Sequence, residues 1–359
     1  ETGDQIRQSE ERHIVGLNSS IVKDIKIGSR TADIEIGTNI RYDNVPEGSL
    51  TRSARRVDLD DPKAIDEINE LNTSLYTSAI YELGKVNLLG GLRADYIQFN
   101  NRSILRNETD FNSKGTFALL PNFSVSYIPN NKTQVLFKTG MGYHSNHSLV
   151  VTGQPDSPTQ PLAYGADLGL QYKFSPQFWM SVTSWYLDLE SEFVYVGDEG
   201  VVEPSGQSRR LGLELNMRSQ ISDNFYALFD INYTHARSVE EPEGADLIPL
   251  AVDLASKAQV VYSRGNFKSS LNMKYIKDRP ANEDNSLVAE GFTLVDLMAS
   301  YQLNQFNFQL TLQNIFDTEW RTAQFATESR LPQETDNVEE VHFTPGEGFF
   351  PRFAVEYRF

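Results

Sequence analysis

The sequence predicts an all-β protein, a transmembrane antiparallel up-and-down β-barrel, and three observations support this prediction. Apolar and polar residues alternate along most of the chain, in stretches of roughly ten residues. Short and long connections between these stretches follow each other in turn. Aromatic residues gather beside the short connections. Successive side chains of a strand point to opposite faces, so this alternation separates an apolar environment from a polar one.

The last segment of the chain, GEGFFPRFAVEYRF, shows the alternation clearly. Apolar and aromatic residues occupy the odd positions from 349 to 359, and small or charged residues occupy the even positions from 352 to 358. Two folds accept this pattern. In a soluble sandwich the apolar face packs on a core, and in a membrane barrel it contacts lipid. The remaining strands decide between the two.

Fifteen strands are predicted in order, each defined by alternation and ended by turn-forming or polar residues. The short connections include 84–85 and 304–305, whereas the long ones include 46–70 and 318–348. Tight turns at one end and long loops at the other are typical of an up-and-down barrel. The predicted strands are 12–22, 30–45, 71–84, 86–101, 115–128, 132–146, 163–174, 178–196, 208–221, 225–238, 252–263, 267–278, 292–303, 306–317 and 349–359.

The two faces recur from strand to strand. The segments IEIGTNIR (34–41), LGLELNMR (211–218) and FNFQLTLQ (306–313) each place apolar residues on one parity and mostly polar residues on the other. A charge at mid-depth in lipid is costly, so charged residues within strands favour a hydrated lumen, where the simplest role is to line and brace the wall. These residues are Arg93, Asp95, Lys138, Asp167, Asp230, Lys257, Lys274 and Asp296.

Aromatic side chains beside the short turns predict a girdle at a lipid–water boundary, where such rings are enriched. Ordinary β-propensity explains some of these residues but not their clustering beside turns. The clustered residues are Tyr127, Tyr172, Phe178, Trp179, Phe225, Tyr262, Phe267, Tyr301, Phe306 and Phe359.

Composition excludes several classes of protein. The net charge of −17 over 359 residues argues against a nucleic-acid partner, which needs a basic surface. The absence of cysteine excludes disulfides, thiolate nucleophiles and cysteine-ligated metals. No apolar run reaches the length of a transmembrane helix, about 18 residues. The nucleophile-elbow, zinc-protease, phosphate-loop and dinucleotide-binding motifs are all missing, so we do not expect an enzyme.

Four segments resemble TonB-dependent outer-membrane receptors. LTLQNIFDTEWR (310–321) is similar to a penultimate-strand segment of that family, and FAVEYRF (353–359) to its last strand. The other two resemble family hairpins. They are LPNFSVSYIPNNKTQVLFKTGMGYHSNHS (120–148) and SRRLGLELNMRSQISDNFYALFDINYTHAR (208–237). The resemblance covers nearly the whole chain, with the segments in the family's order.

The resemblance implies a larger assembly than this chain. The family's barrel has about 22 strands, and its lumen holds a plug. Counting back from the last strand makes residues 1–359 a partial barrel domain, strands about 8 to 22. The polar start, ETGDQIRQSEERH, is no signal peptide. We expect the plug and first strands upstream or in another segment, since open sheet edges are not tolerated in lipid.

The function implied by the resemblance is TonB-dependent active import of a scarce ligand across the bacterial outer membrane. A metal chelate such as a ferric siderophore is the leading ligand, and cobalamin, copper and oligosaccharide are alternatives. A passive porin and a soluble all-β binding module are the other functions considered. The implied partners are the TonB complex, acting through the plug and its TonB box, the missing barrel segment, outer-membrane lipid, lipopolysaccharide and the barrel-assembly machinery.

Candidate ligand contacts are expected where strands rise to the long loops. Imidazole is a common metal ligand, so His144 and His147 are candidates for a metal or metal-chelate contact. Arginine suits carboxylate or phosphate oxygens, and aromatic rings can stack on a ligand. The alternative interpretation is that these residues are only polar side chains at the rim of the barrel and contact no ligand. No cofactor is expected beyond a metal within the ligand, and Tyr357 and Phe359 are the expected assembly signal. The remaining rim candidates are Tyr143, Arg210, His235, Arg237, Trp320, Arg321, Arg330 and His342.

Three long loops are acidic: 58–67, 240–246 and 334–340. Carboxylates can bind calcium, but none of these loops has EF-hand spacing, so a solvated loop is the simpler interpretation. DPKAIDEINELN begins with Asp61 before Pro62, a pattern typical of a helix start. We therefore expect a short helix there, over the mouth of the barrel.

Overall fold

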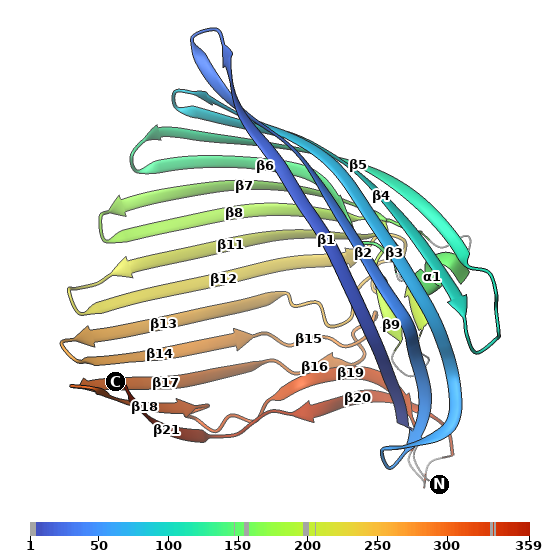
Figure 1. Cartoon of the computed structure of the whole chain (residues 1–359). Helices are drawn as coiled ribbons and strands as arrows, with labels where there is room; N and C mark the ends of the chain where they lie inside the picture. The colour runs from blue at the N-terminus through green and yellow to red at the C-terminus, as the bar shows by residue number, and fades with distance from the viewer. Residues whose placement is uncertain are drawn as a thin grey trace. The chain divides into compact units, whose positions relative to one another are not determined.

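A computed structural model describes residues 5–146, 148–153, 158–196, 201–204, 206–330, 333 and 335–359, without side chains at 60, 61, 193–196 and 201–204. Long antiparallel strands dominate it (Figure 1). The single helix within the described ranges is α1, Ser148–Gly153. The all-β, antiparallel prediction is confirmed. Within the described residues, no helix has the length and apolar character needed to cross a membrane.

The main sheet has fifteen strands, ordered β1-β2-β3-β4-β5-β6-β7-β8-β11-β12-β13-β14-β17-β18-β21. Each strand of this sheet pairs with the strands that come before and after it in the predicted order. This confirms the up-and-down order and the number of strands. The bounds are β1 Gln5–Ile27, β2 Arg30–Ala54, β3 Val57–Leu83, β4 Val86–Ser103, β5 Asn112–Asn130, β6 Thr133–Tyr143, β7 Leu162–Ser175, β8 Phe178–Leu189, β11 Ser208–Gln220, β12 Phe225–Ser238, β13 Leu254–Arg264, β14 Phe267–Ile276, β17 Phe292–Leu303, β18 Phe306–Gln313 and β21 Phe350–Tyr357.

Three two-stranded sheets lie in the long connections. β9 lies at the end of the predicted strand 178–196, and the other five segments lie in predicted loops. The pairs are β9 Phe193–Val196 with β10 Val201–Pro204, β15 Arg279–Pro280 with β16 Val288–Ala289, and β19 Arg321–Ser329 with β20 Val338–Pro345.

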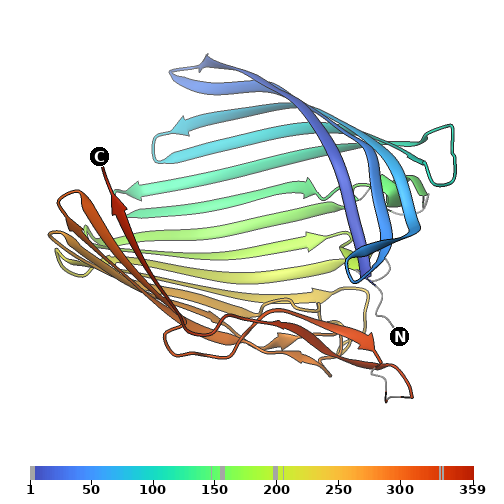
Figure 2. The ribbon, with the colours of Figure 1, turned by 60° about the horizontal axis from the view of Figure 1, so that its bottom comes forward.

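The chain divides into two compact units. Unit 1 contains β1–β4, α1 and most of β5 and β6, and unit 2 contains β11–β14 and β17–β21. Within unit 2 the hairpins β11–β12 and β13–β14 turn at the same end (Figure 2). Unit 1 is Glu1–Tyr127, Phe137–Ala166 and Asp188–Gln207, and unit 2 is Ile128–Leu136, Asp167–Leu187 and Ser208–Phe359.

The predicted loop 46–70 and its helix are wrong. The strands β2 and β3 continue through this region and meet in a tight turn at Arg55 and Arg56, both with positive φ. Pro62 faces Thr51 at an irregular point of the register, where a missing N–H is tolerated. Pairing with β2, and with β4 from Asp66 onward, satisfies the backbone of this segment, and this outweighs the local helix-start signal.

The alternation of faces is visible in the side-chain exposure. Apolar residues on one face stay open to the surroundings, as in Leu75 of unit 1 at 62% and Phe353 of unit 2 at 65%. The opposite face of unit 1 buries polar groups, including Ser74 and Asp95. We call these the apolar face and the polar face. Exposed apolar area on this scale is unfavourable in water and suits hydrocarbon.

Aromatic rings contact one another beside the short turns of unit 2. Phe225 and Tyr262 lie 4.7 Å apart between centroids, and Phe306 and Tyr357 lie 5.0 Å apart. Tyr357 also donates its hydroxyl to Oε1 of Gln305 in the turn at 3.0 Å. The predicted assembly residues Tyr357 and Phe359 are in edge-to-face contact at 5.1 Å.

The predicted strand 306–317 ends early, at Gln313, because the chain turns a corner there. Asn314 and Asp317 adopt positive φ, which asparagine and aspartate tolerate better than other side chains. The side-chain amide of Asn314 donates to the carbonyls of Thr318 and Glu347, and its Oδ1 accepts from Thr318 N–H. Both ends of the following long loop are thereby held at one point.

Candidate functional site

The polar face of unit 1 carries a connected row of side chains. Asn39, Ser74 and Asp95 stand directly opposite one another on β2, β3 and β4. Arg93 Nη1 donates to Asn39 Oδ1 at 2.8 Å, and its Nε lies 2.7 Å from Asp95 Oδ1. Tyr143, predicted as a rim contact, donates its hydroxyl to Asp95 Oδ2 at 2.8 Å. The row links neighbouring strands through paired buried groups.

A second ionic cluster lies further along β2, toward the turn at 55–56. Arg41 binds both oxygens of Asp43, at 2.6 and 2.7 Å. Arg12 on β1 approaches the same carboxylate at 3.7 Å. The bidentate geometry is the stronger form of arginine–carboxylate contact. Two guanidinium groups therefore approach this buried carboxylate, whose direct strand partner on β3 is a second carboxylate, Glu70.

The helix α1 packs on β4 through a small apolar cluster. Val151 of the helix and Phe99 of β4 are fully buried, and Ile97 is nearly so. Tyr143 packs against the same cluster. The sequence predicts a loop over 147–162, because a six-residue helix has too few turns to show a helical period.

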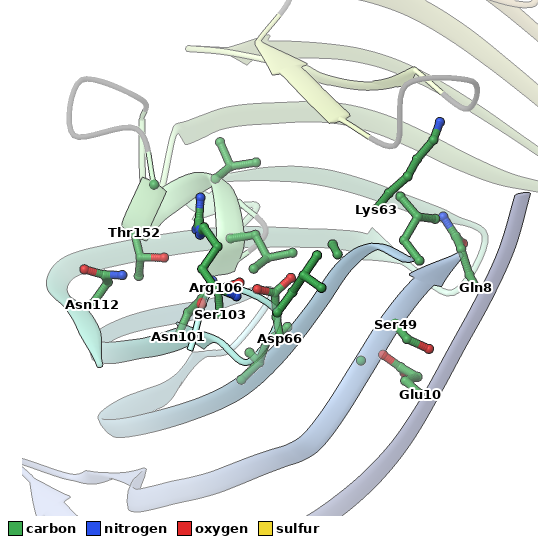
Figure 3. Close-up of a pocket in the computed structure, with 18 of the residues that line it drawn as sticks. Gln8, Glu10, Ser49, Lys63, Asp66, Asn101, Ser103, Arg106, Asn112 and Thr152 are labelled. Atoms are coloured by element: carbon green, nitrogen blue, oxygen red, sulfur yellow. Dashed lines mark hydrogen bonds between the residues drawn. The ribbon is translucent and has the colours of Figure 1, made fainter. Parts of the chain in front are cut away.

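A cavity of about 710 Å³ opens beside α1, between the distal parts of β1–β4 and the connection 104–111 (Figure 3). In Figure 3, Lys63 and Gln8 lie on one side, Arg106 and Thr152 on the other, and Asp66 between them. All lining residues belong to unit 1. They are Gln8, Ser9, Glu10, Gly48, Ser49, Leu50, Lys63, Ala64, Asp66, Ile68, Asn101, Ser103, Leu105, Arg106, Asn112, Leu149, Val150, Thr152 and Gly153.

Two of the cavity's charged side chains have ionic partners outside it. Glu10 pairs with Arg12 at 3.1 Å, and Arg106 pairs with Glu108 at 3.1 Å. Glu108 Oε2 also accepts from the backbone N–H of Ser103 at 3.0 Å, which anchors the connection. The sequence predicts none of these cavity residues as site residues. Most of them lie in 46–70 and 102–114, which are predicted as loops without fixed neighbours, and the others lie in two more strands and in α1.

The predicted residues Trp320 and Arg321 lie in a network of unit 2 loops. Arg321 Nη2 contacts Glu290 at 3.1 Å, and its guanidinium lies over the Phe343 ring at 4.0 Å. Gln324 exchanges two 2.8 Å hydrogen bonds with the backbone of Glu290. Trp320 donates to the carbonyl of Glu347 at 2.9 Å. These contacts tie β19 to the ends of its own loop and to β16.

The same network continues into the two preceding connections. The backbone N–H of Leu250 donates to Pro280 at 2.8 Å, and that of Leu247 donates to Glu283 at 3.2 Å. Burial lowers the pKa of the neighbouring Arg279, an effect that Asp278 partly opposes. Three long connections of unit 2 are therefore joined by hydrogen bonds.

The other predicted residues of unit 2 do not form one cluster. His235 stands opposite Leu211 on the exposed apolar parity, whereas Arg210 lies on the alternate parity. Arg237 pairs with Asp246 at 3.3 Å. His342 Nε2 and Ser329 Oγ are 3.0 Å apart on the β19–β20 hairpin. Arg330 follows that hairpin's first strand and is exposed.

The metal candidates stay a prediction. His144 is exposed just after β6, and His147 lies outside the described residues. Within the described ranges, no group of three or more histidine, aspartate or glutamate side chains is arranged to hold a metal ion.

Residues 6–315 match the family model described as TonB dependent receptor-like, beta-barrel. The chain belongs to this family. The predicted resemblance is confirmed, and with it the outer-membrane location of a TonB-dependent receptor barrel. No curated protein sequence matches the chain.

Solved structures of TonB-dependent receptors share the fold. The unliganded ferric citrate transporter FecA is 15% identical, with a TM-score of 0.81, over 100% of this chain and 56% of that one. The ferric yersiniabactin receptor FyuA from Yersinia pestis is 14% identical, with a TM-score of 0.74, over 99% and 55%. The copper transporter OprC is 13% identical, with a TM-score of 0.75, over 98% and 57%. The chain spans little more than half the length of these proteins.

Proposed function

We propose that this chain forms the barrel wall of a TonB-dependent importer, which takes up a scarce ligand across the bacterial outer membrane. The match to the receptor barrel family over residues 6–315 carries the proposal. The ligand we propose is a metal chelate such as a ferric siderophore. Proteins of similar fold are described as taking ferric citrate and ferric yersiniabactin, and one as taking copper.

The chain's role in this process is physical rather than chemical. The apolar face contacts lipid, and the polar face, with its paired charges, lines the route of the ligand. Import requires no bond to be made or broken in the ligand, so no catalytic group is needed. The TonB complex, acting on a plug, supplies the energy in this proposal.

Uptake of a radioactive ferric chelate by cells that carry the complete protein, with and without TonB, tests the function. We expect uptake in the first strain and only background uptake in the second. Collapse of the proton gradient should abolish uptake in the first strain. Equal uptake in both strains, accompanied by steady conductance in planar bilayers, would instead establish a passive porin.

A further inference from the structure

We propose that the cavity of unit 1 is a ligand site for an aliphatic, amide- or hydroxyl-bearing molecule with a single anionic group, which Lys63 binds. The inference rests on the proposed import function and specifies the ligand's chemistry. It follows from three properties of the cavity: which charged and polar groups are left without partners, which apolar residues line it, and how large it is.

Charge identifies the anionic group. Lys63 lines one side of the cavity, and its ammonium has no ion pair or hydrogen bond within the part of the chain that the structure describes (Figure 3). The other lining cation, Arg106, already has Glu108 at 3.1 Å. One cation is therefore available to a ligand, and it can bind one carboxylate or similar group. A polyanion would leave further charges unmatched beside Glu10 and Asp66.

An amide in the cavity lining identifies a polar, uncharged part of the ligand. Asn101 is 8% exposed, yet its side chain makes no hydrogen bond to any described residue. The amide therefore meets the water of the cavity, and a ligand carbonyl, hydroxyl or N–H can replace that water. Asn101 of β4 is paired with Ile68 of β3, and Lys63 lies further along β3, at an irregular point of its register with β2.

The apolar lining identifies the ligand's body. Leu50, Ile68, Leu105, Leu149 and Val150 line the cavity, and no phenylalanine, tyrosine or tryptophan among the described residues does. An aromatic ligand would find no ring on which to stack, whereas an aliphatic chain finds matching surface. The volume of about 710 Å³ suits a single small molecule. Linear hydroxamate chelates and short acidic peptides share this chemistry.

The test uses the complete protein, purified in detergent, with matched probes and variants. The chelate probes are a ferric linear trihydroxamate ending in a free carboxylate and the same chelate ending in a carboxamide. An acidic aliphatic pentapeptide and its amidated form make the second arm, and a ferric tris-catecholate is the aromatic comparison. The variants are Lys63→Gln and Asn101→Leu, with Lys85→Gln, at a turn distant along the chain, as the control.

We expect the wild type to bind the carboxylate form of one probe about tenfold more tightly than its amidated form, the value of one charge-assisted contact. Lys63→Gln should remove this preference and Lys85→Gln should keep it. Asn101→Leu should weaken both forms equally. A preference for the carboxylate form of the hydroxamate chelate would identify the ligand as a chelate, and a preference for the carboxylate form of the pentapeptide would identify it as a peptide.

Equal binding of both forms by the wild type, tighter binding of the catecholate, or a preference that survives Lys63→Gln would overturn the site. Uptake distinguishes this failure from failure of the proposed function. TonB-dependent uptake that Lys63→Gln leaves unchanged would retain the function and remove the site. Binding that depends on Lys63, without TonB-dependent uptake, would retain the site and remove the function.

Discussion

Tyr76 lies across Gly37, its direct partner on the adjacent strand, and donates its hydroxyl to Glu35 at 3.0 Å. A Cβ placed on Gly37 would overlap the tyrosine ring. Trp185 over Gly212 and Trp320 over Gly346 repeat the arrangement. A ring packed on a glycine restores contact area that the missing side chain cannot supply.

Gly37→Ala should therefore destabilise the protein by about 1–3 kcal/mol, because the ring must leave its position. Gly90→Ala is the matched control, since nothing lies within 4 Å of a Cβ added there. The measurement is the urea concentration at the midpoint of unfolding in detergent. Unfolding is monitored by the heat-modifiable electrophoretic mobility of the protein. Equal midpoints for the two variants would show that the glycine–ring contact has no energetic role.

Tyr143→Phe should lower stability by about 1–3 kcal/mol, because it removes a donor from the buried carboxylate of Asp95. Tyr164→Phe removes a similar bond, to Glu190 at 3.1 Å, from an exposed tyrosine. Tyr164→Phe should lower the free energy of unfolding by well under about 1 kcal/mol. Chemical denaturation of both variants in the same detergent makes the comparison, and the reverse ranking would contradict the buried row of polar groups.

Asn314→Ala should release the corner after β18, because it removes three hydrogen bonds and leaves an unfavourable backbone conformation. Asn314→Gly keeps the backbone geometry, so its rate of trypsin digestion should lie between the rates of Asn314→Ala and the wild type. Asn304, also at positive φ but in a tight turn, is the control, and Asn304→Gly should be neutral. Limited trypsin digestion at Arg330 reports the loop's opening. Unchanged digestion of Asn314→Ala would reject this role.

Gln324→Ala should loosen the attachment of the β19–β20 hairpin to the residues after β16, because Gln324 makes two hydrogen bonds to the backbone of Glu290 and, among the described residues, only the Arg321–Glu290 ion pair remains. Gln324 is 2% exposed, so water cannot replace its bonds without opening the packing. Hydrogen exchange of residues 288–291 should accelerate several-fold, while Thr322→Ala on the same strand should leave it unchanged. Slow exchange in both variants would mean that other contacts hold the loops.

The sequence predicted the regular part of the fold because lipid imposes a strict two-residue period. Leu213 and Phe353 follow that period, and both are exposed on the apolar face. The period is not a sufficient guide over residues 61–70 of β3. There Pro62 and Asp61 signalled a helix, but pairing with β2 and β4 decided the structure.

The candidate site was less predictable, because its groups come from separate strands. Tyr143 and Asp95 are 48 positions apart in sequence, and nothing local indicates that they meet. Lys63 and Asn101 were hidden in segments interpreted as loop or unremarkable strand. Trp320 and Arg321 were recognised as notable, and the structure shows the contacts within the fold that occupy them.

The long β2–β3 hairpin has a further consequence. Its first strand has 25 residues, which at about 3.3 Å per residue extends roughly 80 Å. Even a steep inclination leaves much of that length beyond a hydrocarbon layer about 30 Å thick. The two arginines at its tip, at one end of that length, therefore stand outside the hydrocarbon layer, and a short epitope inserted between them would be reached there by an antibody.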